Sequence, residues 1–136
     1  MRFFSILCLL FLCISCANTK KATHSYPLNG TWTPIKQEIA GKELPAIAFK
    51  NQKLVIADSN FTFTAESVDK GICRYQNGQM DLYGKQGVNT GKHFMCIYKL
   101  ENNQLSICYN LAGDSYPVDF ETKSKPTLFV CVYAKE

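Results

Sequence analysis

Beyond about residue 28, apolar and polar side chains alternate along much of the chain with a period of two. Phe61 and Phe63 alternate with threonines, and segment 94–100 keeps the same spacing. Because successive side chains of a β-strand point to opposite faces, this period predicts strands with one buried face. No long stretch keeps helical spacing, so the pattern predicts an all-β domain.

The alternation predicts eight strands separated by residues that favour turns. They are 30–38, 52–57, 60–66, 70–76, 79–84, 92–100, 104–110 and 127–135. Turn residues such as Asn77-Gly78 stand between them, and segment 39–51 has room for one short helix. Eight strands joined mainly by hairpins predict an up-and-down antiparallel barrel, which leaves no sheet edge exposed. A five-stranded barrel and a β-sandwich are the alternatives.

The hairpin around Asn102-Asn103 predicts a register between two of these strands. A tight turn there makes one face apolar throughout, by placing Leu100 opposite Leu105, Tyr98 opposite Ile107 and Cys96 opposite Tyr109. Cys96 and Cys108 then lie on different faces and should not bond to one another. The inward positions of all strands form the expected core: Leu54, Ile56, Phe61, Phe63, Tyr75, Leu82, Phe94, Tyr98, Leu105, Ile107, Phe129 and Tyr133.

The first 16 residues have the three parts of a secretory signal. Arg2 is followed by an apolar run over 3–14 and then by small residues, and this run is shorter than the roughly 20 residues of a membrane-spanning helix. Cys16 resembles the lipid-attachment cysteine of bacterial lipoprotein signals, although Cys13 departs from that pattern. We expect a lipid anchor at Cys16, a polar tether over 17–27, a domain over 28–136 and a place in the bacterial cell envelope; cleavage and secretion in soluble form is the alternative.

Composition narrows the class of protein further. The chain has 136 residues, enough for one domain and not two, and its 46% hydrophobic and 19% charged residues describe a globular protein. The net charge of +4 is modest, the lysines are scattered, and the arginines are Arg2 and Arg74 alone. Nucleic-acid binding needs a clustered basic face, so this function is disfavoured.

Four cysteines fall in the predicted domain: Cys73, Cys96, Cys108 and Cys131. In an exported chain an even number permits two disulfides, with three possible connectivities. Free cysteine is also a common core residue, so the sequence leaves both states open.

The start of the first strand carries a family resemblance. Gly30-Thr31-Trp32 matches the G-x-W signature of lipocalins and related barrels, and further segments follow in order: Gly41-Lys42 with Pro45, Ile97 to Leu100, Leu105 to Cys108, and Pro117 to Phe120. This series resembles a family of small secreted bacterial lipocalin-like domains over nearly all of 28–136. The resemblance implies that Trp32, beside Gly30, plugs one end of an eight-stranded barrel and that the other end admits a ligand.

The chain departs from this family at two points. Cys96 stands where the family tends to have glycine before its Ile-Tyr pair. The arginine that usually packs over the tryptophan of lipocalins has no match, unless Lys135 takes its place.

The many rings of the core predict a narrow cavity at best. We expect it to be lined by Phe61, Phe63, Tyr75, Tyr98 and Tyr109, with apolar burial supplying affinity and tyrosine hydroxyls orienting any polar group. The leading hypothesis is a non-enzymatic envelope lipoprotein that binds a small hydrophobic or amphipathic molecule. The alternative is a solid barrel that acts as a protein-interaction or inhibitor module through its loops at 84–91 and 112–126.

Catalytic and metal-binding patterns are weak. His93 and Cys96 have an H-x-x-C spacing, but three residues along a strand place the two side chains on opposite faces, which prevents shared zinc coordination. His93 is expected to be a solvated strand residue, and His24 lies in the tether. A nucleophile would have to pair His93 with an exposed Cys108 or Ser106. No pair of carboxylates has a spacing for acid-base work, so we expect no cofactor, no metal and no enzymatic activity.

Overall fold

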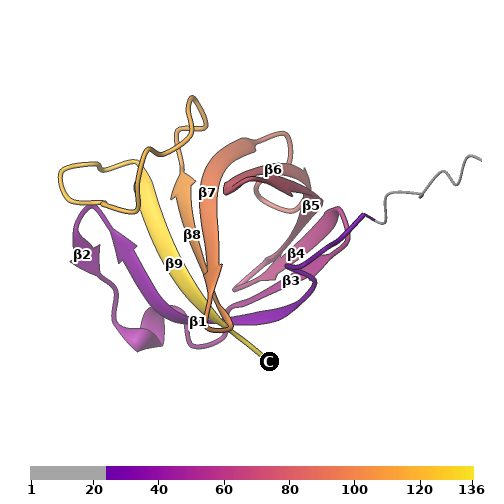
Figure 1. Ribbon diagram of the computed structural model, residues 1–136. Helices are drawn as coiled ribbons and strands as arrows, with labels where there is room; N and C mark the ends of the chain where they lie inside the picture. Colours follow the sequence, from indigo (N-terminus) through magenta and orange to yellow (C-terminus); the bar gives the residue numbers. More distant parts are fainter. Residues whose placement is uncertain (1–23) are drawn as a thin grey trace, which may run out of the picture.

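The computed structural model describes residues 24–136 as a closed barrel of antiparallel strands (Figure 1). The predicted signal 1–16 with Cys16, and the tether up to residue 23, lie outside the described residues. Each strand pairs with the next, and the last pairs with the first. The eight strands of the barrel are β1 (Gly30–Ile39), β3 (Lys53–Ala57), β4 (Asn60–Thr64), β5 (Val68–Gln76), β6 (Gln79–Gln86), β7 (His93–Glu101), β8 (Gln104–Asn110) and β9 (Leu128–Lys135).

This architecture confirms the predicted all-β barrel with eight strands and excludes the five-stranded barrel and the sandwich. A further strand, β2 (Lys42–Glu43), forms a hairpin with the end of β1. Ala40 and Gly41 make its turn with positive φ angles of 51° and 76°.

The short helix predicted after the first strand is a single turn of 3-10 helix, η1 (Ala46–Ala48). Its N-cap is Pro45, which makes no side-chain capping hydrogen bond, and none of its three residues is buried. Short helices need a cap or a packed apolar face to persist. With neither, the segment closes only one turn.

The hairpin between β7 and β8 has the predicted register. Asn102 and Asn103 form its turn with φ angles of 51° and 58°, as a tight turn between twisted strands requires. The pairs are those expected: Leu100 with Leu105, Tyr98 with Ile107, and Cys96 with Tyr109. Cys96 and Cys108 therefore lie on opposite faces of the sheet, as predicted.

The interior of the barrel holds the whole predicted core, to which the structure adds Leu28, Met80 and three cysteines. Trp32 is 1% exposed, and its indole N–H donates to the carbonyl of Leu28 at 2.9 Å. The ammonium of Lys135 lies 5.3 Å from the centre of the Trp32 ring. Lys135 thus occupies the place over the tryptophan for which the sequence offered no arginine.

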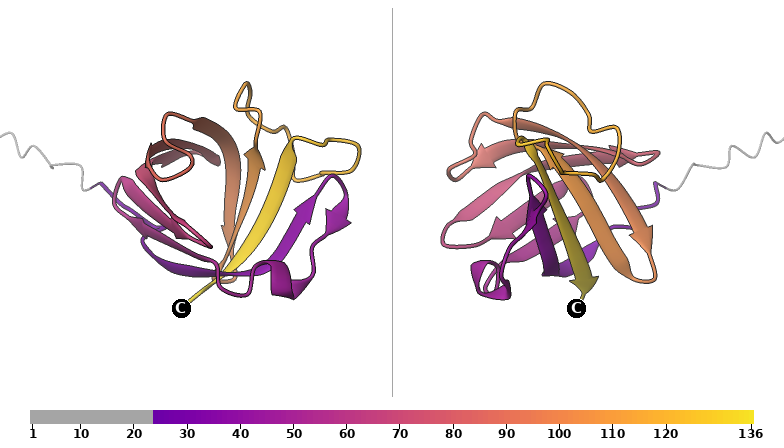
Figure 2. Two further views of the ribbon diagram at one scale, coloured as in Figure 1. Left: turned by 180° about the vertical axis from the view of Figure 1, so that it is seen from behind. Right: turned by 90° about the vertical axis from the view of Figure 1, so that its left-hand side faces the viewer.

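Segment 112–126 covers part of the outer wall (Figure 2). Thr122, which is fully buried, accepts the Gly41 N–H at 2.9 Å and donates to Glu38, so the segment is fastened to the β1–β2 hairpin. Cys108 points outward from β8 but is fully buried. The expectation of an exposed Cys108 was wrong, because outward parity does not reveal a covering loop.

All four domain cysteines are free thiols in buried positions. Desolvation is the main cause that raises their pKa, to about 12 for Cys73 and to about 11 for Cys108 and Cys131. Buried protonated thiols pack as small apolar side chains. Of the two states that the sequence left open, the structure has the one with free thiols.

Candidate functional site

A cavity of about 160 Å³ lies inside the barrel, at the end of β9 opposite to Lys135. Its wall is mainly apolar and contains four phenylalanines: Phe61, Phe63, Phe94 and Phe129. Phe61 is buried, whereas the other three are half-buried. An apolar pocket with a few polar groups is the usual form of a small-molecule site.

Three of the five predicted ligand-binding residues line this cavity: Phe61, Phe63 and Tyr109. Tyr75 and Tyr98 do not. Their rings pack edge to face with centroids 5.6 Å apart, and the Tyr75 hydroxyl accepts the backbone N–H of Leu28 at 3.3 Å. The alternation predicts correctly that both face inward but contains no information on depth along the barrel.

Two tyrosines belong to the cavity wall, which also contains the polar residues Asp69 and Asn89. Tyr109 and Tyr133 lie 2.7 Å apart, oxygen to oxygen, so one hydroxyl donates to the other. Burial raises the pKa of both well above the ordinary value, so both stay neutral at physiological pH. The donor oxygen keeps its lone pairs, which a ligand hydroxyl or amide could use. Tyr133 was predicted only as a core residue.

The rim of the mouth is held by a buried carboxylate. Asp69, which is 5% exposed, accepts the backbone N–H and the side-chain N–H of Asn89 at 3.0 and 3.1 Å. These bonds hold the loop 87–91 beside the cavity, which Asn89 also lines. The sequence placed this carboxylate before the strand, whereas β5 begins at Val68 and Asp69 points inward. In the sequence, the only signal for this contact between Asp69 and the loop was the glycines and the asparagine of the loop.

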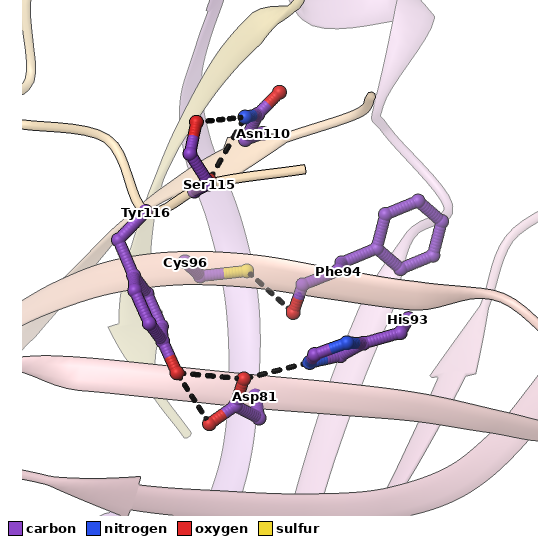
Figure 3. Close-up of polar contacts among 7 residues, drawn as sticks. All are labelled: Asp81, His93, Phe94, Cys96, Asn110, Ser115 and Tyr116. Atoms are coloured by element: carbon purple, nitrogen blue, oxygen red, sulfur yellow. Dashed lines mark hydrogen bonds and ion pairs between the residues drawn. The ribbon is translucent and has the colours of Figure 1, made fainter. Parts of the chain in front are cut away.

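A second cluster lies on the outer wall, where Asp81 joins two elements (Figure 3). His93 Nε2 donates to the Asp81 carboxylate at 2.7 Å, and the Tyr116 hydroxyl donates to both of its oxygens at 2.9 and 2.8 Å. The His93 ring stacks on Tyr83 with centroids 4.3 Å apart. His93 thus lies on the outer face of its strand with 31% of its side chain exposed, and it is held there by two contacts that the sequence did not predict.

Neither Cys96 nor Ser115 makes a hydrogen bond to this cluster. Cys96 lies on the opposite face from His93, as predicted, and its thiol contacts the Phe94 carbonyl at 3.7 Å (Figure 3). Ser115 belongs to a separate set of hydrogen bonds with Asn110 and Asp114. The cluster thus fastens segment 112–126 to β6 and β7. Within residues 24–136, no group of three or more His, Cys, Asp or Glu side chains is placed to hold a metal ion.

No model of a known protein family, no curated protein and no solved structure matches the chain. In the described part of the chain, no helix is long and apolar enough to cross a membrane. The barrel, its buried first-strand tryptophan and the cavity at its mouth are features that support a proposal about function.

Proposed function

We propose that the protein is a non-enzymatic, lipocalin-like envelope lipoprotein that binds a small hydrophobic or amphipathic ligand in the mouth of its barrel. The observation that carries this proposal is the apolar cavity of about 160 Å³ with the Tyr109–Tyr133 pair in its wall. Cys16 would attach the protein to a membrane, and the polar residues that follow it would serve as a tether.

The size of the cavity limits the ligand. Its volume of about 160 Å³ is close to that of engineered apolar cavities of about 150 Å³, which hold one benzene molecule. Sites for larger ligands usually measure about 300–1,000 Å³. We therefore propose that one ring or a short alkyl segment enters the cavity, while the rest of the ligand lies at the rim.

Affinity would be modest. Burial of one CH₂ group contributes about 0.8 kcal/mol, so a chain of six contributes roughly 5 kcal/mol before the cost of association. This corresponds to a Kd no tighter than about 0.2 mM for the chain alone. Tighter binding would need a polar head group that bonds to the tyrosine pair or to the rim.

A titration with linear alcohols from butanol to decanol, followed by NMR, tests the cavity. We expect the signals of Phe63, Phe94 and Phe129 to shift and the affinity to rise with chain length until the cavity is full. Phe63→Trp fills the cavity and should weaken binding at least tenfold, whereas Val88→Trp, on the exposed side of the rim loop, should not. Equal binding by both variants, or no binding of any alcohol, would refute the proposal.

The anchor is tested separately. Cells that express the wild-type protein and take up a fatty-acid analogue should label the protein, and Cys16→Ala should abolish the label. Absence of label from the wild type, or label that survives in the variant, would contradict the anchor without bearing on the cavity.

One observation favours the alternative of an interaction module. Val88 and Val118, on the two loops named for that function, are 70% and 89% exposed. Single exposed valines are common on protein surfaces, so this observation carries less weight than the cavity. If Val88→Asp and Val118→Asp abolished recruitment of an envelope protein while alcohol binding persisted, the interaction module would become the better proposal.

A further inference from the structure

Strand β5 has a short unpaired edge. Its pairing with β4 ends at Ile72, whereas β5 continues to Gln76 with β6 on one side only. The N–H of Cys73 still donates to the Ser59 carbonyl at 2.8 Å, on the β4 side. Since backbone groups of alternate residues point to the same side of a strand, the N–H and C=O of Tyr75 also point away from β6.

The N–H of Tyr75 has no hydrogen-bond acceptor among residues 24–136. An unpaired strand edge is a template for pairing with another segment in extended conformation. The backbone N–H of Tyr75 is thus available for hydrogen bonding at a position where the barrel itself supplies no partner.

A groove of about 580 Å³ runs beside this edge. Residues 73–76 line it on one side and segment 24–26 on the other, and it extends to Asp81 and Tyr116. Figure 1 shows the chain just before β1 passing beside β4 and β5 at the right of the barrel. The volume lies within the range of about 300–1,000 Å³ that is typical of ligand sites.

Arg74 places a positive charge in the groove, which Asp81 also lines with its carboxylate. It is exposed, its guanidinium lies 5.8 Å from the centre of the Tyr83 ring, and it forms no ion pair with any residue in 24–136. Asp81 is its partner across β5 and β6, but the oxygens of Asp81 are taken by Tyr116 and His93. The N–H groups of the guanidinium are therefore available to a carboxylate from another molecule.

We propose that an extended peptide segment with an acidic side chain binds in this groove as an additional strand beside β5. Its backbone pairs with Tyr75, and its carboxylate pairs with Arg74. A strand added at this edge presents alternate side chains on the outer face, next to that of Arg74. This interaction surface is separate from the mouth cavity and does not depend on ligand binding there.

The guanidinium of Arg74, whose N–H groups make no ion pair within residues 24–136, argues for a separate acidic peptide over the chain's own N-terminal segment. Residues 17–23 contain Lys20 and Lys21 and no acidic residue. They would bring two more positive charges close to Arg74. The partner that fits this surface is a segment of another protein that is extended and negatively charged.

The probe for the test is the peptide acetyl-Thr-Val-Glu-Val-Thr-amide, titrated into the labelled protein and followed by NMR. We expect saturable shifts in the amide signals of 73–76 and slower hydrogen exchange at the Tyr75 N–H. An analogue with Lys in place of Glu should bind at least tenfold more weakly. Of two analogues N-methylated at adjacent backbone positions, one should lose binding and the other keep it, because only alternate amides face the edge.

Variants test the ion pair. Arg74→Gln should weaken binding of the Glu peptide at least tenfold and remove its advantage over a Gln analogue. Lys85→Gln removes an exposed cation from β6, outside the groove, and should leave the affinity unchanged.

Several outcomes would overturn the proposal. Equal affinity for the Glu and Lys peptides would remove the acidic preference, and equal binding of both methylated analogues would indicate anion binding without strand pairing. Shifts confined to the barrel mouth, or no saturable binding, would place the site elsewhere. If the Tyr75 amide of the free protein is already protected, dependence on protein concentration would identify a second copy as occupant, and loss of protection on deletion of 17–23 would identify the chain itself.

Discussion

The hydroxyl of Tyr116 donates to both carboxylate oxygens of Asp81, at 2.9 and 2.8 Å, and joins the longest loop of the barrel to the middle of β6. Hydrogen bonds to charged groups contribute about 1.5–3 kcal/mol when buried. This pair is partly exposed, so we expect Tyr116→Phe to lower the free energy of unfolding by about 1 kcal/mol. Urea unfolding measures this loss.

The same variant should affect segment 112–126 more than the barrel. Hydrogen exchange of its amides should become faster, because the loop loses a point of attachment while the β6–β7 pairing remains. Val118→Ala changes an exposed residue of the same loop and provides the control. Unchanged exchange in Tyr116→Phe would show that the loop is held by its other contacts, such as those of Thr122.

The buried thiols predict that stability falls at alkaline pH. Burial raises the pKa of Cys73 to about 12 and that of Cys131 to about 11, against 9.0 for the unfolded chain. Above pH 9 the unfolded state loses these protons while the folded state keeps them, so the free energy of unfolding decreases as pH rises. At pH 10 each thiol accounts for roughly 1.4 kcal/mol of this loss.

Urea unfolding at several pH values between 7.5 and 10 measures this dependence. Cys73→Ala removes one of these thiols and should make the decrease shallower by about 1.4 kcal/mol over that range. The variant also leaves a small cavity in place of the sulfur, which lowers stability equally at all pH values. A slope identical to that of the wild type would contradict the assignment of a raised pKa to Cys73.

The absence of a side chain at Gly84 supports the rim of the cavity. A Cβ atom built at this position would lie 1.9 Å from the carbonyl oxygen of Asn89, too close for any side chain. Gly84→Ala must therefore displace the loop 87–91. We expect it to lower the free energy of unfolding by about 2 kcal/mol or more and to weaken ligand binding at the mouth.

Gly91→Ala, in the same loop, is the matched control. Gly91 has a φ angle of 82°, but a Cβ atom there would contact nothing within 4 Å. Gly91→Ala should therefore lower the free energy of unfolding only through backbone strain, by about 1 kcal/mol, and should not affect ligand binding. If the two variants lost equal stability, steric contact with Asn89 would not be the cause.

The parts of the fold that depend on local alternation could be predicted from the sequence. The register of β7 and β8 could be predicted from the turn residues Asn102-Asn103. The inward position of Phe61 and Phe63 could be predicted from the polar residues that alternate with them. These features need only the period of a strand and a tight turn, both of which are properties of neighbouring residues.

The features that were missed depend on contacts between segments far apart in the sequence. Cys108 is buried and His93 is held because segment 112–126 folds back over β8 and because β6 and β7 place Tyr83 opposite His93. The long loop had no periodic pattern from which its path could be inferred. In the same way, Tyr75 and Tyr98 are excluded from the cavity by their depth in the barrel, which depends on the stagger of all eight strands.

The position of Lys135 over Trp32 yields a last prediction, on the closed end of the barrel. With the ammonium 5.3 Å from the ring centre, a cation–π interaction contributes about 0.5–1 kcal/mol at a partly exposed site. Lys135→Met keeps most of the apolar stem and removes the charge, so it should lower the free energy of unfolding by that amount, whereas Lys85→Met on the outer wall should not.

Gly30→Ala should remove the same interaction by another route, because a Cβ atom at Gly30 would lie 2.7 Å from Cε of Lys135 and displace it. The charge-removing effect of Lys135→Met should consequently disappear in the Gly30→Ala background, and a full effect in both backgrounds would show that the stabilisation by Lys135 does not pass through the Trp32 ring.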